Sequence, residues 1–220
     1  MTHMYKEHDK ISELFDLLDK WRYFPAYQLE RRADIFFAIF LKQIIQNKYN
    51  LSIDTVIPEF PVRVGAIIEK EINKSFKIDY VAVNQKMKEV FLVELKTDLL
   101  SRREKQDWYL KRAQEINIYG LVDGLIKIFH ATNQKSKYMY LLNDIEVLGW
   151  IEMSGNIIKN TSERYDVKIL YIQPEKHPEE SANVVTFDEI ISLIKTNTDA
   201  LSIRFAESLE HWKVNPNNPA

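Results

Sequence analysis

The chain has 220 residues, of which 45% are hydrophobic and 28% charged, with only five glycines and seven prolines. This composition favours one globular domain with a sizeable core and argues against long disordered tracts. The absence of cysteine excludes disulfides, thiolate metal sites and cysteine nucleophiles, and it fits a reducing compartment. A formal net charge of −2 gives no basic excess, so any nucleic-acid role must depend on a local basic surface.

The polar, charged segment 1–10 lacks the apolar core of a signal peptide. The most apolar run, 33–41, is far shorter than the roughly 20 residues that span a bilayer. We therefore expect a cytoplasmic protein with no membrane partner.

The first third of the chain predicts two helices and an irregular strand. Apolar residues at helical spacing mark a short amphipathic helix at 11–21. A second pattern, 28–49, is apolar around much of its girth and predicts a helix buried between layers. Pro58 and Pro61 predict an edge or irregular strand over 57–64, because proline removes a donor from the sheet.

A hairpin and a long helix are predicted next. The β-like runs 76–83 and 89–96 are joined by a polar connector of hairpin length, so we expect them to pair antiparallel. Ser101 and Glu104 match the S-x-x-E capping box, which predicts a helix beginning at 101. Its pattern runs to about residue 119, where Gly120 is the expected break.

The last third of the chain continues the alternation of strand and helix signals. The pattern predicts strands at 167–172 and 184–187 and helices at 189–195 and 201–212. Asp188 is the expected N-cap of the first of these helices, and the polar tail 213–220 is expected to be disordered. The sequence thus predicts an α/β fold in one domain spanning 1–220, with its core at about 27–195.

Three charged residues on the hairpin are expected to converge. Side chains alternate along a strand, so Glu94 and Lys96 project to the same face. Folding the hairpin about its connector brings Asp79 almost opposite Val93 and Glu94. Two carboxylates and one ammonium then share a small patch.

This trio suits metal-dependent hydrolysis of a phosphodiester. Carboxylate oxygens from Asp79 and Glu94 are the ligands that Mg²⁺ prefers, with Mn²⁺ as a substitute and the Leu95 carbonyl as a further ligand. Such a metal polarises the phosphodiester and lowers the pKa of a bound water. The Lys96 ammonium could position that water or neutralise developing charge.

The segments Ile78-Asp79 and Glu94-Leu95-Lys96 resemble the PD-(D/E)XK nuclease superfamily, whose pattern is an acid on one strand and E-x-K on the next. The resemblance implies a restriction-endonuclease-like fold, in which helices flank a small mixed central β-sheet, here with extra N- and C-terminal helices. It also implies an endonuclease or exonuclease acting on DNA. Many relatives pair to cut both strands, so the resemblance allows a homodimer.

Further residues agree with this resemblance. Gln106, followed one turn later by Tyr109, looks like the Gln/Tyr helix motif of RecB-type members with a spacing one residue shorter, which makes Gln106 a phosphate or water contact. Members often carry an additional upstream acid, for which Glu30 and Glu59 are the candidates and Glu69 a weaker third. The candidate nucleic-acid contacts on the same helix are Arg102, Arg103, Lys105, Tyr109, Lys111 and Arg112.

Other interpretations remain open from the sequence. Asp79, Glu94 and Lys96 could form a structural ion-pair cluster at a sheet edge. The basic helix could be a solvated face, because acids are interleaved with its cations. The chain could be an inactive nuclease-fold protein that serves as a nucleic-acid-binding or assembly module, or an unrelated α/β interaction domain. RNA as the substrate is also left open.

Overall fold

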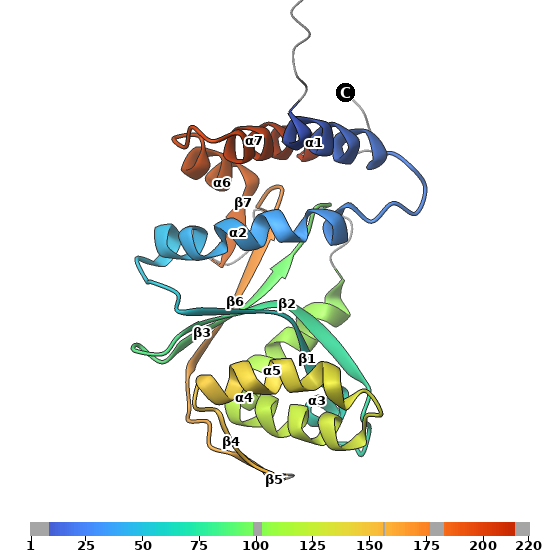
Figure 1. Ribbon diagram of the computed structural model, residues 1–220, viewed down its shortest axis with the longest axis vertical. Helices are drawn as coiled ribbons and strands as arrows, with labels where there is room; N and C mark the ends of the chain where they lie inside the picture. The colour runs from blue at the N-terminus through green and yellow to red at the C-terminus, as the bar shows by residue number, and fades with distance from the viewer. Residues whose placement is uncertain (1–8, 99–102, 156, 177–182, 214–220) are drawn as a thin grey trace, which may run out of the picture. The chain divides into compact units, whose positions relative to one another are not determined.

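The structure is a computed structural model, and its described residues are 9–98, 103–155, 157–176 and 183–213 (Figure 1). By internal contacts the chain divides into two compact units. Unit 1 comprises 1–50, 95–101 and 171–220, and unit 2 comprises 51–94 and 102–170. The assignment of the whole chain to one nuclease domain stays a prediction.

Unit 1 is mainly helical. Its elements are α1 (Lys10–Trp21), α2 (Leu29–Tyr49), β7 (Val184–Thr186), α6 (Phe187–Ile194) and α7 (Ala200–Trp212). The predictions of helices at 11–21, 28–49 and 201–212 are confirmed. Phe205 of α7 lies at the centre of the unit, fully buried, with its ring centroid 5.1 Å from that of Phe37 and 5.6 Å from that of Phe40 on α2.

The start of α6 differs from the sequence prediction. Asp188 was expected to be the N-cap, and this was wrong, because Thr186 occupies that position. The Thr186 hydroxyl accepts from the Glu189 amide at 3.3 Å, and the Glu189 carboxylate accepts from the Thr186 amide at 2.7 Å. This reciprocal capping box lets strand β7 pass directly into the helix.

Unit 2 contains the predicted hairpin. Its elements are β1 (Thr55–Arg63), α3 (Val64–Ile68), β2 (Ser75–Asn84), β3 (Glu89–Leu95, whose last residue belongs to unit 1), α4 (Glu104–Ala131), α5 (Lys135–Val147), β4 (Ile151–Ser154), β5 (Ile157–Asn160) and the first part of β6 (Asp166–Gln173). Strands β2 and β3 pair antiparallel, with Tyr80 opposite Val93, which confirms the hairpin. Strand β1 pairs antiparallel with the other side of β2.

Five of the strands form one mixed sheet in the order β1-β2-β3-β6-β7, in which β6 and β7 are parallel (Figure 1). Helices flank this sheet, so the predicted α/β class with a mixed sheet is confirmed. Strand β1 lies at the edge, as Pro58 and Pro61 required. Between them Glu59 has a φ of 51°, which interrupts the regular backbone of the strand. Strands β4 and β5 form a separate two-stranded sheet.

Helix α4 is kinked at Asn117 rather than at Gly120, where the sequence predicted the break. Asn117 has φ 61° and ψ −176°, inside the range of α4. Its side-chain Nδ2 donates to the Tyr165 carbonyl at 2.9 Å, and its Oδ1 accepts from the Tyr165 amide at 3.1 Å and the Ile118 amide at 2.9 Å. The amide thus binds the kink to the segment before β6 and caps the second half of the helix.

The beginning of α4 was also predicted too early. The helix starts at Glu104 with Arg103 as N-cap, and Arg103 makes no side-chain capping bond. Ser101, the expected cap, lies outside the described residues, as does 214–220 of the predicted tail. In the part of the chain that the structure describes, no helix is long and apolar enough to cross a membrane.

Candidate active site

Asp79 lies on β2 and Glu94 on β3, both within unit 2. The antiparallel register ends with Tyr80 opposite Val93, and Asp79 and Glu94 are the next residues of the two strands beyond that pair. The next pair in this register would be Asp79 and Glu94, and opposite residues project from the same face of a sheet. Glu94 is 1% exposed and Asp79 is half-buried.

Gln106 from the first turn of α4 binds Glu94. Its side-chain Nε2 donates to Glu94 Oε1. A carboxylate that follows four apolar strand residues, 90–93, is costly to bury, and a hydrogen bond from a neutral amide offsets part of that cost. The structure therefore brings together two of the predicted site residues, and Gln106 fixes the orientation of the Glu94 carboxylate.

Lys96 lies in unit 1, and its side chain is 5% exposed. Its backbone amide donates to the Ile172 carbonyl at 2.8 Å, and its Nζ donates to the Leu95 carbonyl at 3.0 Å. The same Nζ lies 3.6 Å from Glu30 Oε1 in the first turn of α2. Of the predicted upstream acids, Glu30 is thus the one paired with Lys96, and the Leu95 carbonyl is a hydrogen-bond acceptor for Lys96.

The other candidate acids have basic partners of their own. Glu59 is exposed, and its carboxylate pairs with Lys77, two residues before Asp79 on β2. Glu69 lies 3.5 Å from an Arg112 guanidinium nitrogen. The Glu59 carboxylate is therefore held beside Lys77 by an ion pair between β1 and β2.

Tyr109 anchors α4 on the sheet. Its ring stacks on Phe76 of β2, with a centroid distance of 4.9 Å and an interplanar angle of 18°. Lys105 Nζ lies 5.7 Å from the centroid of the same ring. Tyr109, predicted to contact nucleic acid, is thus a packing residue in this structure.

The remaining predicted contacts on α4 are mixed in character. Arg112 pairs with Glu115, and this second carboxylate further neutralises its guanidinium. Arg103 and Lys111 are exposed, whereas Arg102 lies outside the described residues. The described basic surface of α4 is therefore partly cancelled by its own acids.

The donor atoms around Asp79 and Glu94 are of the kind that suits Mg²⁺. Among the described residues, no three or more His, Asp or Glu side chains gather as a ready-made metal cluster. A cation held by Asp79 and Glu94 would complete its shell with water or backbone oxygen, as Mg²⁺ commonly does. Two hard carboxylates, one of them oriented by Gln106, fit such a partly hydrated ion.

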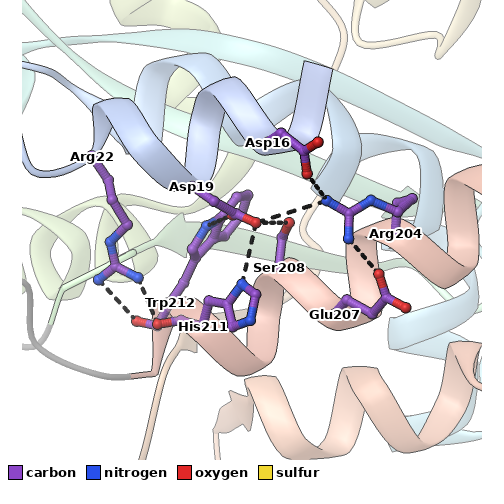
Figure 2. Close-up of polar contacts among 8 residues, drawn as sticks. All are labelled: Asp16, Asp19, Arg22, Arg204, Glu207, Ser208, His211 and Trp212. Atoms are coloured by element: carbon purple, nitrogen blue, oxygen red, sulfur yellow. Dashed lines mark hydrogen bonds and ion pairs between the residues drawn. The ribbon is translucent and has the colours of Figure 1, made fainter. Parts of the chain in front are cut away.

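A second polar cluster joins α1 to α7 in unit 1 (Figure 2). Asp19 accepts hydrogen bonds from Trp212 Nε1 at 2.7 Å and Ser208 Oγ at 3.0 Å, and its carboxylate lies 3.2 Å from His211 Nδ1. In a nucleophilic triad the serine bonds the histidine and is reachable by substrate. Here Ser208 is fully buried and donates to Asp19 instead, so the cluster fastens two helices.

Arg22 extends this fastening. Its guanidinium donates to the His211 carbonyl at 2.7 Å and to the Trp212 carbonyl at 3.5 Å, at the C-terminal end of α7. Burial lowers the pKa of Arg22 from its ordinary value. Sequence analysis missed this cluster, because its two halves lie about 190 residues apart in the chain.

No protein-family model matches this chain, and neither does any curated protein or solved structure.

Proposed function

We propose that this protein is a Mg²⁺-dependent nuclease of the PD-(D/E)XK type that hydrolyses phosphodiester bonds in DNA. The observation that carries the proposal is the buried carboxylate of Glu94 near the end of β3, which is held by Gln106. Glu94 follows the Tyr80–Val93 pair on β3, and Asp79 adjoins the same pair on β2. Burying a carboxylate among apolar residues lowers stability, and such costs concentrate at functional sites.

The proposed roles follow from the chemistry of each group. Asp79 and Glu94 would hold the cation, which when bound supplies an acidified water and a polarised phosphoryl oxygen. Lys96, two residues after Glu94 on an extended segment, would project to the same side and orient the attacking water. Glu30, 3.6 Å from Lys96 Nζ, would help to hold that ammonium in place.

Hydrolysis forms one bond to phosphorus and breaks another. The water oxygen forms a bond to phosphorus while the bond from phosphorus to the leaving sugar oxygen breaks. Lys96 would stabilise the charge that develops on the phosphoryl oxygens. The proton given up by water ends on solvent or the leaving oxygen. We extend the proposal to a cytoplasmic location and to a homodimer when both strands are cut.

A second candidate function is an inactive nuclease-fold protein that binds nucleic acid or supports assembly. Arg112 favours it, because this predicted phosphate contact is neutralised by Glu115 and Glu69. Binding of Mg²⁺ separates the two candidates. Calorimetry should detect Mg²⁺ binding to the wild-type protein, and Asp79→Asn should abolish it if the first candidate is right.

A plasmid-nicking assay tests the nuclease proposal. Wild-type protein should nick supercoiled DNA with Mg²⁺ or Mn²⁺ and not with EDTA. We expect Asp79→Asn, Glu94→Gln and Lys96→Ala each to lower the rate at least about 100-fold, as loss of a group that stabilises the transition state does.

The matched controls are Asp123→Asn and Lys127→Ala. These residues form an ion pair on α4, and the two substitutions repeat Asp79→Asn and Lys96→Ala away from the site. Both controls should retain the wild-type rate, and all variants should keep the wild-type circular dichroism. Equal nicking by Lys96→Ala and wild type, or no metal-dependent nicking by wild type, would refute the proposal.

A further inference from the structure

Exposed apolar side chains gather on α1 and the turn that follows it. In the part of the chain that the structure describes, fifteen large apolar or aromatic residues are exposed, and five of them lie within 14–24: Leu14, Leu17, Trp21, Tyr23 and Phe24. Single exposed apolar residues are common on protein surfaces, whereas a cluster of them marks an interaction site. We call Leu14, Leu17 and Trp21 the α1 stripe, because these three belong to the helix.

The α1 stripe points away from the contact between α1 and α7. At about 100° per residue, its three residues fall within about 60° of one another around the helix. Asp19, which accepts from the Trp212 indole of α7 at 2.7 Å (Figure 2), lies about 160° around the helix from Trp21. The exposed fractions of Leu14, Leu17 and Trp21 are 43%, 37% and 38%, so α7 leaves the stripe open to a partner.

The spacing of the α1 stripe is that of a helix that packs on another helix. Leu14, Leu17 and Trp21 are three and four residues apart, which are the a and d positions of a heptad repeat. Glu13 and Lys20 then both occupy g positions, on one flank of the stripe. Along that flank the charge therefore changes sign, from acidic near the N-terminal end of α1 to basic near its C-terminal end.

This arrangement of charge is complementary to itself. When two copies of α1 pack antiparallel about a two-fold axis, each flank meets the same flank of the second copy. An axis close to residue 17, at the middle of the stripe, sets Glu13 of one copy within about 3 Å, measured along the helices, of Lys20 of the other. By symmetry the contact then contains this ion pair twice.

Both charges are accessible to a second copy. Lys20 is exposed and has no ion-pair partner among the residues that the structure describes. Glu13 pairs with Lys10, whose side chain is 88% exposed. Such a pair at the surface contributes little to stability, so Glu13 can exchange it for a partner across an interface.

We propose that α1 is a dimerisation helix, through which two copies of this chain associate antiparallel by their α1 stripes. The inference goes beyond the proposed nuclease function, because the association needs neither metal nor DNA. A nucleic acid or an anionic membrane is the poorer match. Helix α1 carries three acids, Glu13, Asp16 and Asp19, against two lysines, so it would repel a polyanion.

The area of the contact sets its expected strength. A fully buried aromatic side chain contributes about 150–250 Å², so the exposed parts of the five clustered side chains amount to roughly 500 Å² on each copy. Two copies would thus bury about 1,000 Å², at the low end of specific interfaces. We therefore expect a dissociation constant on the order of 10 µM.

Sedimentation velocity at about 1–200 µM protein, a range that brackets this constant, tests the inference. Wild type should shift from monomer to dimer across the range, and Leu14→Gln/Leu17→Gln should raise the dissociation constant at least about 10-fold. The matched control is Ile35→Gln/Ile39→Gln on α2, which replaces two apolar side chains that are 59% and 54% exposed. This control should dimerise like wild type.

Charge reversal distinguishes the antiparallel pair from other contacts. Glu13→Lys alone, or Lys20→Glu alone, sets like charges against each other in the dimer and should raise the dissociation constant at least about 3-fold. The double variant Glu13→Lys/Lys20→Glu restores opposite charges and should regain the wild-type constant. An equimolar mixture of the two single variants should also regain it, because each copy then meets a partner of opposite charge.

Three results would overturn the inference. The first is a wild type that stays monomeric at about 200 µM, which would leave the stripe to segment 1–8 of the same chain or to a different protein. The second is equal weakening by the α2 control, and the third is a double variant that does not regain the wild-type constant. All the substituted side chains are exposed, so unchanged urea unfolding is the expected check on folding.

This inference and the nuclease proposal fail separately. If wild type nicks plasmid but sediments as a monomer, only the α1 interface is refuted. If wild type dimerises through α1 but does not nick plasmid, the nuclease proposal is refuted and the interface stands.

Discussion

Replacing Asn117 by glycine and by alanine tests the kink in α4. In an ordinary helix interior, alanine is more stable than glycine by about 1 kcal/mol. Asn117 instead has φ 61° and ψ −176°, a region that only glycine occupies without strain. At this position we therefore expect the reverse order, with the glycine variant more stable than the alanine variant.

The magnitude can be worked from the hydrogen bonds. Both substitutions remove three of them, two to the Tyr165 backbone and one to the Ile118 amide. At about 1 kcal/mol each, their removal costs about 3 kcal/mol. Relative to alanine, glycine avoids about 1–3 kcal/mol of backbone strain in the folded state. The greater entropy of its unfolded chain lowers the free energy of unfolding by about 0.4–1 kcal/mol. The glycine variant should exceed the alanine variant by about 1–2 kcal/mol.

Urea unfolding followed by circular dichroism measures this difference. Lys111, exposed in the first half of α4, supplies the control: there Lys111→Ala should be more stable than Lys111→Gly by about 1 kcal/mol. The two positions in one helix should thus give opposite signs. If Asn117→Ala proves more stable than Asn117→Gly, residue 117 is helical and the kink does not exist.

Two further predictions concern unit 1. Burial, the largest influence, raises the pKa of Glu189, but hydrogen bonds from Lys48 and Thr186 outweigh it and lower that pKa below its ordinary 4.5. The ionised Glu189 therefore stabilises the fold above pH 4.5, and this contribution is lost as the pH falls through the lower pKa of the folded state. Urea unfolding of Glu189→Gln should depend less on pH between 5 and 3 than that of wild type. Parallel pH profiles of the two proteins would contradict this. Asp19→Ala removes the acceptor of the buried Trp212 indole at 2.7 Å. It should lower the free energy of unfolding by about 2–3 kcal/mol, and an unchanged urea midpoint would contradict it.

Much of the fold could be predicted because its elements have strong local patterns. Helices α1, α2 and α7 place apolar residues at helical spacing, and the β2–β3 hairpin has alternating runs with a connector of the right length. Strands β4 and β5 were not predicted from the sequence. The strands that follow α5 are only four residues long, too short for alternation to distinguish them from loop.

Where prediction and structure differ, a tertiary or capping interaction overrides local propensity. Gly120 was the expected helix breaker, yet the break falls at Asn117, because its amide binds the backbone of Tyr165, 48 residues away. Asp188 is a good N-cap residue by type. Thr186 takes that position because Glu189 completes a capping box with it.

The candidate site divides in the same way. The places of Asp79 and Glu94 beside the Tyr80–Val93 pair follow from the length of the hairpin connector, which the sequence contains. From the sequence, Glu30 and Glu59 were equal candidates for the upstream acid, because no local pattern distinguishes them. Only the packing of α2 brings Glu30 to Lys96, 66 residues away in the chain.

The contact between α1 and α7 has a consequence for how the protein is made. Asp19 and Ser208 are 189 residues apart in the chain, so α1 leaves the ribosome long before its partner helix exists. At about 5–20 residues per second, that interval lasts roughly 10–40 s. During it the apolar side of α1, with Phe15 and Leu18, has no α7 to cover it. A nascent chain of this protein therefore carries an apolar helix surface for that interval before α7 can bury it.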